Sequence, residues 1–203
     1  VEDAPPVEDA PPVEDAPPAE DAPPVEDIRT PISIAAGKIA RAEELLAAGN
    51  PVEAAEQYKA ALAADPSNVF AMLGLGVTFL AQAQYDFAEK EFRKVLRVSP
   101  NNIEGNYQLG LTLYRRGVYT GAAQQLRRAI EIDREHPLAH VTLGEALNQL
   151  GDTDAAIEAL ETAIDLHPES GKAFYALGIA YDRKGQHDRA AEMYRRSREV
   201  GGR

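Results

Sequence analysis

Apolar residues recur at three- and four-residue intervals along most of the chain after residue 35. The pattern is clear in LGLGVTFL (residues 73–80) and FYALGIAY (residues 174–181), where it marks one face of a helix. A Gly or Ala-Gln break follows such a segment, and a second helical pattern such as YDFAEKEFRKVL (residues 85–96) comes next. The pattern therefore predicts helices joined in pairs, as helical hairpins.

The same residue types return every 34 residues. A glycine column holds Gly76, Gly110, Gly144 and Gly178, and an alanine column holds Ala54, Ala88, Ala122, Ala156 and Ala190. A leucine precedes each of these glycines, and a large apolar residue stands four positions after each alanine. Small residues let two helix backbones approach closely, while large residues fill the space beside them. The folded part of the chain is thus predicted to be a repeat array.

These columns resemble the pattern of the tetratricopeptide repeat (TPR) family. The best-matched unit carries the family residues Met72, Leu75, Gly76, Phe79, Ala88, Phe92 and Pro100. The resemblance implies five tandem 34-residue repeats, at residues 35–68, 69–102, 103–136, 137–170 and 171–203. It also implies an all-α fold, a right-handed superhelical array of helical hairpins (a TPR solenoid) that occupies residues 31–203.

Local signals at the ends of the units agree with this division. Segments such as Asp65-Pro66-Ser67-Asn68 place a proline where one helix must stop and an Asn or Ser where the next can be capped. The first unit departs from the pattern, because Arg41 and Ala42 replace the usual Leu-Gly pair. We interpret this departure as that of an end unit, which faces solvent or another domain.

A different composition occupies the first 27 residues, where the hexamer VEDAPP is repeated with little change. This segment carries ten acidic residues and no basic one, whereas residues 28–203 carry 23 acidic residues and 21 Lys and Arg. The net charge of −12 is therefore concentrated in the tail. Paired prolines favour polyproline II, so we predict a disordered acidic Pro-rich tail or linker at residues 1–30. Its charge opposes binding to nucleic acid.

Composition restricts the class of protein further. The chain contains no cysteine, which excludes disulfides and thiolate metal sites, and no apolar run is long enough to cross a membrane. The first residue is Val rather than Met, which leaves open a segment removed from in front of Val1. The sequence leaves the localisation unknown. We favour the cytoplasm, and the periplasm or a membrane anchor remains open if such a segment was removed.

No motif in the sequence predicts catalysis or a cofactor. Gly74 and Gly76 lie within a helical pattern rather than after a strand, which argues against a dinucleotide loop. His136 and His140 have a spacing that could hold zinc beside Glu135, but no third ligand is near in the sequence. We predict neither a metal nor a cofactor, and the chain is expected not to be an enzyme.

In the TPR family, the first helices of successive hairpins line a concave groove that binds a peptide or a helix. Carried over by the resemblance, the partner-binding groove consists of Phe70, Leu73, Val77, Leu80, Tyr107, Leu111, Tyr114, Arg115, Val141, Tyr175 and Ile179. Family members that grip a terminal carboxylate need Lys, Asn and Arg there, but one such column here reads Glu43, Val77, Leu111, Glu145 and Ile179. A mostly apolar groove fits an apolar segment or an amphipathic helix. Alternatively, some of these side chains only pack between helices.

The last repeat is rich in basic residues. This basic end comprises Lys172, Arg183, Lys184, Arg189, Arg195 and Arg196. One hypothesis is a weak, salt-sensitive contact with the acidic tail, either within one molecule or between molecules. The alternative is that the tail is a solubilising spacer and the basic end a solvated surface.

The sequence favours a protein-protein interaction scaffold or adaptor that helps to assemble a larger complex. Two alternatives stay open: a TPR module of a larger enzyme or membrane-anchored assembly, with the tail as interdomain linker, and a self-assembling bacterial TPR scaffold. The expected partner is a protein or peptide, with a homo-oligomer as a further case and no nucleic acid.

Overall fold

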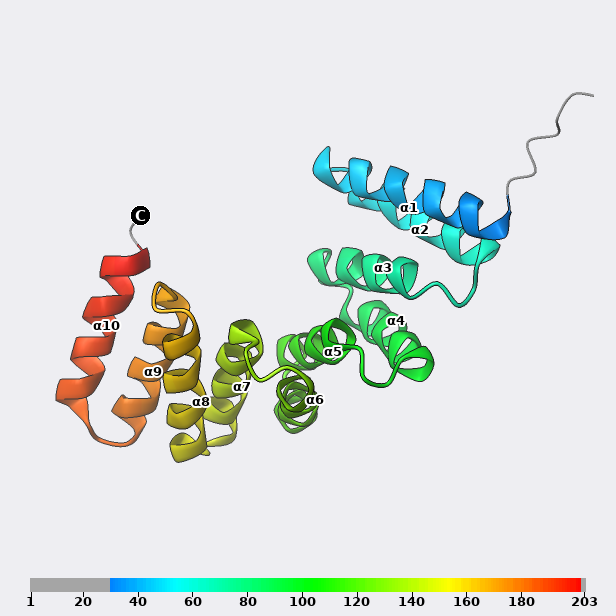
Figure 1. The fold of residues 1–203 in the computed structure, drawn as a ribbon. Coiled ribbons are helices and arrows are strands. Elements are labelled where there is room, and N and C mark those ends of the chain that lie inside the picture. Colours follow the sequence, from blue (N-terminus) through cyan, green and yellow to red (C-terminus); the bar gives the residue numbers. More distant parts are fainter. Residues whose placement is uncertain (1–29, 202–203) are drawn as a thin grey trace, which may run out of the picture.

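The computed structural model describes residues 30–201 of the 203-residue chain. Ten α-helices occupy this part and account for most of its residues (Figure 1). Their bounds are α1 Pro31–Ala47, α2 Pro51–Ala64, α3 Val69–Ala81, α4 Tyr85–Val98, α5 Ile103–Arg115, α6 Tyr119–Ile132, α7 Pro137–Leu150, α8 Thr153–Leu166, α9 Gly171–Arg183 and α10 His187–Gly201. The predicted disordered tail lies outside the described residues, apart from Thr30.

The helices form a continuous curved array of antiparallel pairs. Each odd-numbered helix packs on the even-numbered helix that follows it, and each even-numbered helix packs on the next odd-numbered one. Figure 1 shows these pairs following one another from α1 at one end of the array to α10 at the other. The all-α solenoid predicted from the 34-residue period is therefore confirmed for residues 30–201.

The glycine column marks a close approach of the two helices in the last four hairpins. A Cβ added to Gly76 would lie 2.6 Å from the ring of Phe92, and one added to Gly144 would lie 2.4 Å from Leu160 Cγ. The same contacts join Gly110 to Leu126 and Gly178 to Tyr194. Each large residue thus fills the space that its glycine leaves open, which confirms the packing predicted from the two columns.

Side chains at the helix starts bond to backbone N–H groups. Asn68, Asn102 and Ser170 accept hydrogen bonds from the N–H groups three residues further on, at 3.0, 2.7 and 3.3 Å. These bonds satisfy donors that have no partner inside the helix. The capping role predicted for these Asn and Ser residues is confirmed.

The turn inside each hairpin uses a residue with positive φ. This turn position recurs every 34 residues, and its φ angles are 79° at Gly49, 57° at Ala83, 79° at Gly117, 80° at Gly151 and 75° at Gly185. Glycine adopts the left-handed region without a steric penalty, whereas alanine does not. The second repeat therefore carries a residue poorly suited to its turn.

The first unit is polar where inner units are apolar, as its sequence predicted. Arg41, at the column of Leu75, is largely exposed and pairs with Glu44 at 2.6 Å. In the described part of the chain, none of the helices combines the length and apolar character needed to cross a bilayer.

Candidate partner-binding face

The odd-numbered helices lie on the inner side of the curve. Each of them contacts the next odd-numbered helix as well as its even-numbered neighbours, whereas the even-numbered helices of residues 30–201 make no contacts with one another. Neighbouring units are closest on the inner side of a curved array, so the helices that touch across units occupy that side (Figure 1). We call this surface the odd-helix face. It carries the residues of the predicted groove.

Helix α3 gives the odd-helix face its apolar character. Its sequence, VFAMLGLGVTFLA, contains no charged residue. Phe70, Leu73, Val77 and Leu80 are spaced three or four residues apart and so share one side of the helix. Phe70 is 75% exposed and Val77 is 37% exposed, while Leu73 and Leu80 are half-buried. Apolar side chains are thus available on α3 for contact with another molecule.

The other predicted groove residues differ in how accessible they are. On α5, Leu111 and Tyr114 are half-buried and Arg115 is exposed; on α9, Tyr175 is 57% exposed and Ile179 half-buried. All five present at least part of their side chains to solvent. Their role in partner binding remains a prediction.

Tyr107 and Val141 lie beneath the surface that their neighbours form. Val141 is 2% exposed and packs in a cluster with Ala163 and Ala173, and the Tyr107 ring lies 4.7 Å from that of His136. The structure therefore corrects the expectation that both side chains are open to a partner. Packing between successive units covers these two residues, which was the alternative noted for such positions.

Leu138 was missed by the sequence-based assignment. This residue of α7 is 56% exposed and stands 68 residues, or two repeat periods, after Phe70. It occupies the same place at the start of its helix as Phe70 does on α3. Adding two 34-residue periods to Phe70 gives position 138, so the repeat register alone could have identified Leu138.

A carboxylate interrupts the apolar surface at its centre. The side chain of Glu145 on α7 is mostly buried, and Lys172 Nζ from α9 lies 2.8 Å from its Oε2 atom. Burial raises the pKa of Tyr114, and the negative charge of Glu145 raises it further. Burial also raises the pKa of Tyr107. The odd-helix face is therefore apolar along α3 and mixed from α7 onwards, where this ion pair lies on the same face as the exposed Leu138 and Tyr175.

The basic end is not one cluster of free cations. Lys172 is at the start of α9, whereas Arg183 and Lys184 are at its end, roughly 16 Å away along the helix axis. Other cations have carboxylate partners: Lys184 contacts Asp154 at 2.5 Å, and Glu192 pairs with both Arg195 and Arg196. Arg189 instead lies over the ring of Tyr181, at 5.6 Å.

The two histidines considered for zinc have structural roles. Nδ1 of His136 accepts a hydrogen bond from the N–H of Ala139 at 3.1 Å and so caps α7. Nε2 of His140 donates to the carbonyl oxygen of Arg134 at 3.0 Å. Among residues 30–201 no group of three potential ligand side chains is close enough to hold a metal ion.

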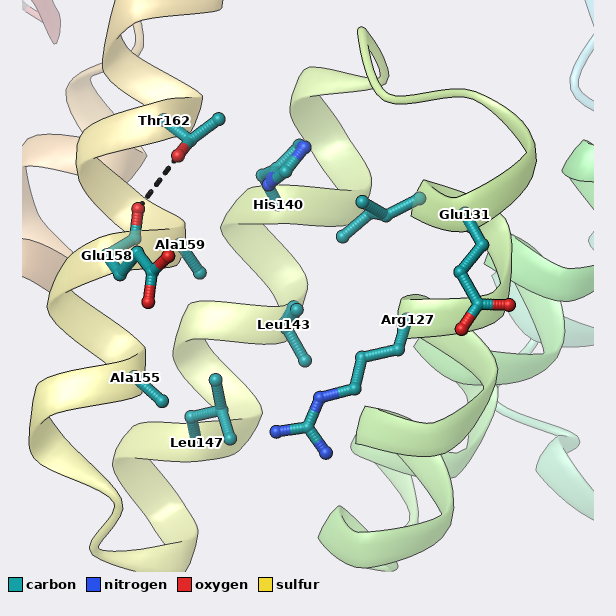
Figure 2. Close-up of a pocket in the computed structure, with 10 residues that line it drawn as sticks. Arg127, Glu131, His140, Leu143, Leu147, Ala155, Glu158, Ala159 and Thr162 are labelled. Carbon is teal, nitrogen blue, oxygen red and sulfur yellow. Dashed lines mark hydrogen bonds between the residues drawn. The ribbon is translucent and has the colours of Figure 1, made fainter.

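An open cleft of about 350 Å³ lies between α6, α7 and α8 (Figure 2). Leu143 and Leu147 of α7 form its apolar floor, while Arg127 of α6 and Glu158 of α8 stand at opposite sides. Thr162 donates to the carbonyl oxygen of Glu158 at 2.9 Å, so its hydroxyl is used within α8. The arrangement brings together no acid, base and nucleophile in mutual contact.

Family models match most of the described array. Two models of the tetratricopeptide repeat match residues 45–111 and 141–201, and a model of anaphase-promoting complex, cyclosome, subunit 3 matches residues 81–163. No curated protein sequence matches the chain significantly.

Several solved structures share the fold. A crystal structure of MamA protein is 28% identical, with a TM-score of 0.74, over 82% of this chain and 91% of that chain. MamA residues 41 to the end from Desulfovibrio magneticus RS-1 are 26% identical, with a TM-score of 0.76, over 82% and 94%. YrrB, described as a TPR protein with an unusual peptide-binding site, is 27% identical, with a TM-score of 0.69, over 82% and 86%.

Proposed function

Because this chain belongs to the tetratricopeptide repeat family, whose arrays are protein-interaction scaffolds, we propose that it binds a protein partner through its odd-helix face. The partner contributes an apolar segment or the apolar side of an amphipathic helix, and the bound array helps to assemble a larger complex. The chain acts by binding rather than by catalysis.

The proposal rests chiefly on the exposed apolar side of α3. Phe70 and Val77 are seven residues apart on a helix without any charge, and Leu73 and Leu80 continue the same side. Contiguous apolar side chains on a surface are a feature of interaction sites, whereas single exposed ones are common everywhere. The likeness to YrrB, described as a TPR protein with an unusual peptide-binding site, supports a peptide or protein segment as the partner.

The polar half of the face provides orientation for the partner. Glu145 and Lys172 form an ion pair near the half-buried Tyr114, so a partner segment meets only apolar contacts at α3 and both charged and apolar ones at α7 and α9. An amphipathic helix with one charged end fits this gradient. Apolar contacts supply most of the affinity, and charged contacts at the edge fix the direction of binding.

Affinity capture with two matched double variants tests the proposal. In Phe70→Asp with Val77→Asp, two exposed side chains of α3 become charged; in the control, the exposed Val52 on α2 and Val98 on α4 are changed to Asp. All four side chains are exposed, so both variants are expected to fold, which circular dichroism checks.

We expect the wild type and the α2/α4 control to capture the same proteins from a lysate, and the α3 variant to lose them. An apolar segment of a captured protein, made as a synthetic peptide, should then bind at least tenfold more weakly to the α3 variant by calorimetry. Equal capture by all three proteins, or equal affinity for the peptide, contradicts the assignment of the odd-helix face.

A further inference from the structure

Helix α4 presents a row of cations on the outer side of the array. Arg93 and Lys94 lie three and four residues after Lys90 and four and three before Arg97, so the four share one side of the helix. We call these four residues the α4 basic stripe. Lys90, Arg93 and Arg97 are exposed, and Lys94 is half-buried.

Two acids of α4 lie beneath the stripe, and the third, Asp86, is exposed in the first turn and pairs with Arg116 at 2.9 Å. Glu89 is 4% exposed and Glu91 is 8% exposed. Arg93 pairs with Glu89, and Lys94 contacts Glu91 at 2.7 Å. Among residues 30–201, no carboxylate lies within 4 Å of Lys90 or Arg97. Lys90 and Arg97 therefore stay available on the solvent side of α4, whereas Arg93 and Lys94 are paired with the acids beneath them.

A cleft of about 540 Å³ runs along the stripe, between α4, α5 and α6. The half-buried Leu96 and the buried Leu109 give it an apolar base, Gln125 stands on its α6 side, and Glu91, paired with Lys94, also borders it. On α6, Arg128 donates to the side chain of Asn101 at 2.7 Å and is paired with Glu131 at 2.8 Å. The site thus combines apolar contact area with cations and suits a segment that alternates acidic and apolar residues.

We propose that the acidic segment at residues 1–27 of the same molecule docks in this cleft, along the α4 basic stripe. Its hexamer VEDAPP places a Glu-Asp pair beside Ala, Pro and Val in every period, and the segment has ten acids and no base. The acids pair with the stripe, and Pro and Val contact the half-buried Leu96. The near-identical hexamers offer several equivalent ways to bind.

The way the chain is connected favours docking within one molecule. The acidic segment joins the array at α1, and Figure 1 places α1 and α4 in the same half of the array, with α10 at the opposite end. Extended at about 3.1 Å per residue, 27 residues reach up to roughly 80 Å. A tether of this kind holds a segment at an effective concentration of the order of millimolar.

Another binding site for the acidic segment, and another acidic partner for the α4 basic stripe, each fit less well. On α10, the cations alternate with Asp188, Glu192 and Glu199, so that helix presents both signs to solvent. On α8, Glu158 and Asp165 form part of an acidic side that a second copy could bring to the α4 stripe. A second copy lacks the tether, so the acidic segment of the same molecule has the advantage at micromolar protein concentration.

Paramagnetic relaxation in the full chain tests the proposal. The chain has no cysteine, so Ala16→Cys gives one site for a nitroxide label within the acidic segment. We expect the amide signals of residues 90–97 to lose intensity at about 20 mM salt and to recover at about 0.5 M salt, where charges are screened within a few ångströms. Reduction of the nitroxide provides the reference spectrum.

Charge-reversal variants show whether the acidic segment binds the α4 basic stripe or the last repeat. Lys90→Glu with Arg97→Glu should abolish the effect on α4, and Lys90→Gln with Arg97→Gln should weaken it without reversing charge. Arg183→Glu with Arg198→Glu is the matched control, because these two exposed residues also have no carboxylate within 4 Å in the described part. The control should keep the full effect.

Three results would overturn the proposal. The first is signal loss on α9 and α10 in place of α4, and the second is no loss anywhere at low salt. The third comes from mixing isotope-labelled protein that lacks nitroxide with unlabelled protein that carries it. Signal loss on α4 in that mixture equal to the loss in the single sample assigns the contact to a second molecule. None of these outcomes bears on partner capture by the odd-helix face, so the two proposals fail separately.

Discussion

The turn at Ala83 offers a sharp test of the relation between repeat sequence and stability. Four of the five equivalent turn positions hold glycine at φ between 75° and 80°, whereas Ala83 is held at φ 57°. We predict that Ala83→Gly stabilises the array. The left-handed region costs a residue with a Cβ atom about 1–2 kcal/mol, and glycine avoids this cost.

The gain is smaller than the relieved strain because glycine also loses more backbone entropy on folding, about 0.5–1 kcal/mol. The net increase in the free energy of unfolding is therefore about 0.5–1 kcal/mol. For a domain of this size, such a gain raises Tm by about 1–4 °C. Urea unfolding and thermal melting, both followed by circular dichroism at 222 nm, measure the two quantities.

Two control substitutions separate the relief of backbone strain from the entropy that glycine loses on folding. Gly151→Ala is the converse change: its φ is 80° and an added Cβ meets no atom within 4 Å, so its cost of about 1 kcal/mol reflects the backbone alone. Ala191→Gly, at an exposed position inside α10, should destabilise by about 1 kcal/mol. If Ala83→Gly destabilises as Ala191→Gly does, the strain argument is refuted.

Three further predictions follow from packing, titration and capping. Gly144→Ala should lower the free energy of unfolding by about 1–3 kcal/mol in urea melts, because its Cβ would lie 2.4 Å from Leu160 Cγ; Leu160→Ala in the same chain should recover part of the loss specific to this contact. Burial and a 2.8 Å hydrogen bond to Asp182 raise the pKa of Tyr194 to about 12, so absorbance at 295 nm should show a tyrosine ionising late, absent in Tyr194→Phe. The pKa of Tyr194 in the folded chain exceeds its unfolded value near 10, so its contribution to stability is complete below pH 10 and declines as the pH rises towards 12. If the urea midpoint of Tyr194→Phe falls as much as that of the wild type between pH 10 and 12, this argument is wrong. Asn102→Ala should cost about 1 kcal/mol in the same melts through loss of its 2.7 Å cap, and no change would rule out the cap as a stabilising contact.

Much of the fold could be predicted from the sequence because the determining interactions are local. Apolar spacing sets each helix, Asn68 and Asn102 cap helices through residues three positions away, and the glycine and large-residue columns meet within one hairpin. Every hairpin uses the same arrangement of columns. A repeat that matches the pattern poorly can therefore be placed from the register of the repeats beside it. The 34-residue period was therefore enough to predict the order and pairing of the helices in the described array.

The candidate site was less predictable, because exposure depends on contacts between units. Tyr107 and Val141 occupy groove columns but are covered by residues of the following helices, while Leu138 is exposed and was overlooked. A column assigns a side of a helix. It does not say how far the next unit reaches over that side, since this depends on the size of side chains 20 to 40 residues away.

The sequence by itself determined the helices, their pairing and the location of charge along the chain. Only the tertiary structure decided which charges stay available: Lys184 and Lys172 are paired with Asp154 and Glu145, 30 and 27 residues earlier in the chain. On α4, Arg93 and Lys94 pair with the buried Glu89 and Glu91, whereas Lys90 and Arg97 are exposed and have no carboxylate within 4 Å among residues 30–201. Every Lys and Arg counts equally in the net charge. The electrostatic potential at the surface also depends on which of them the packing places next to a carboxylate.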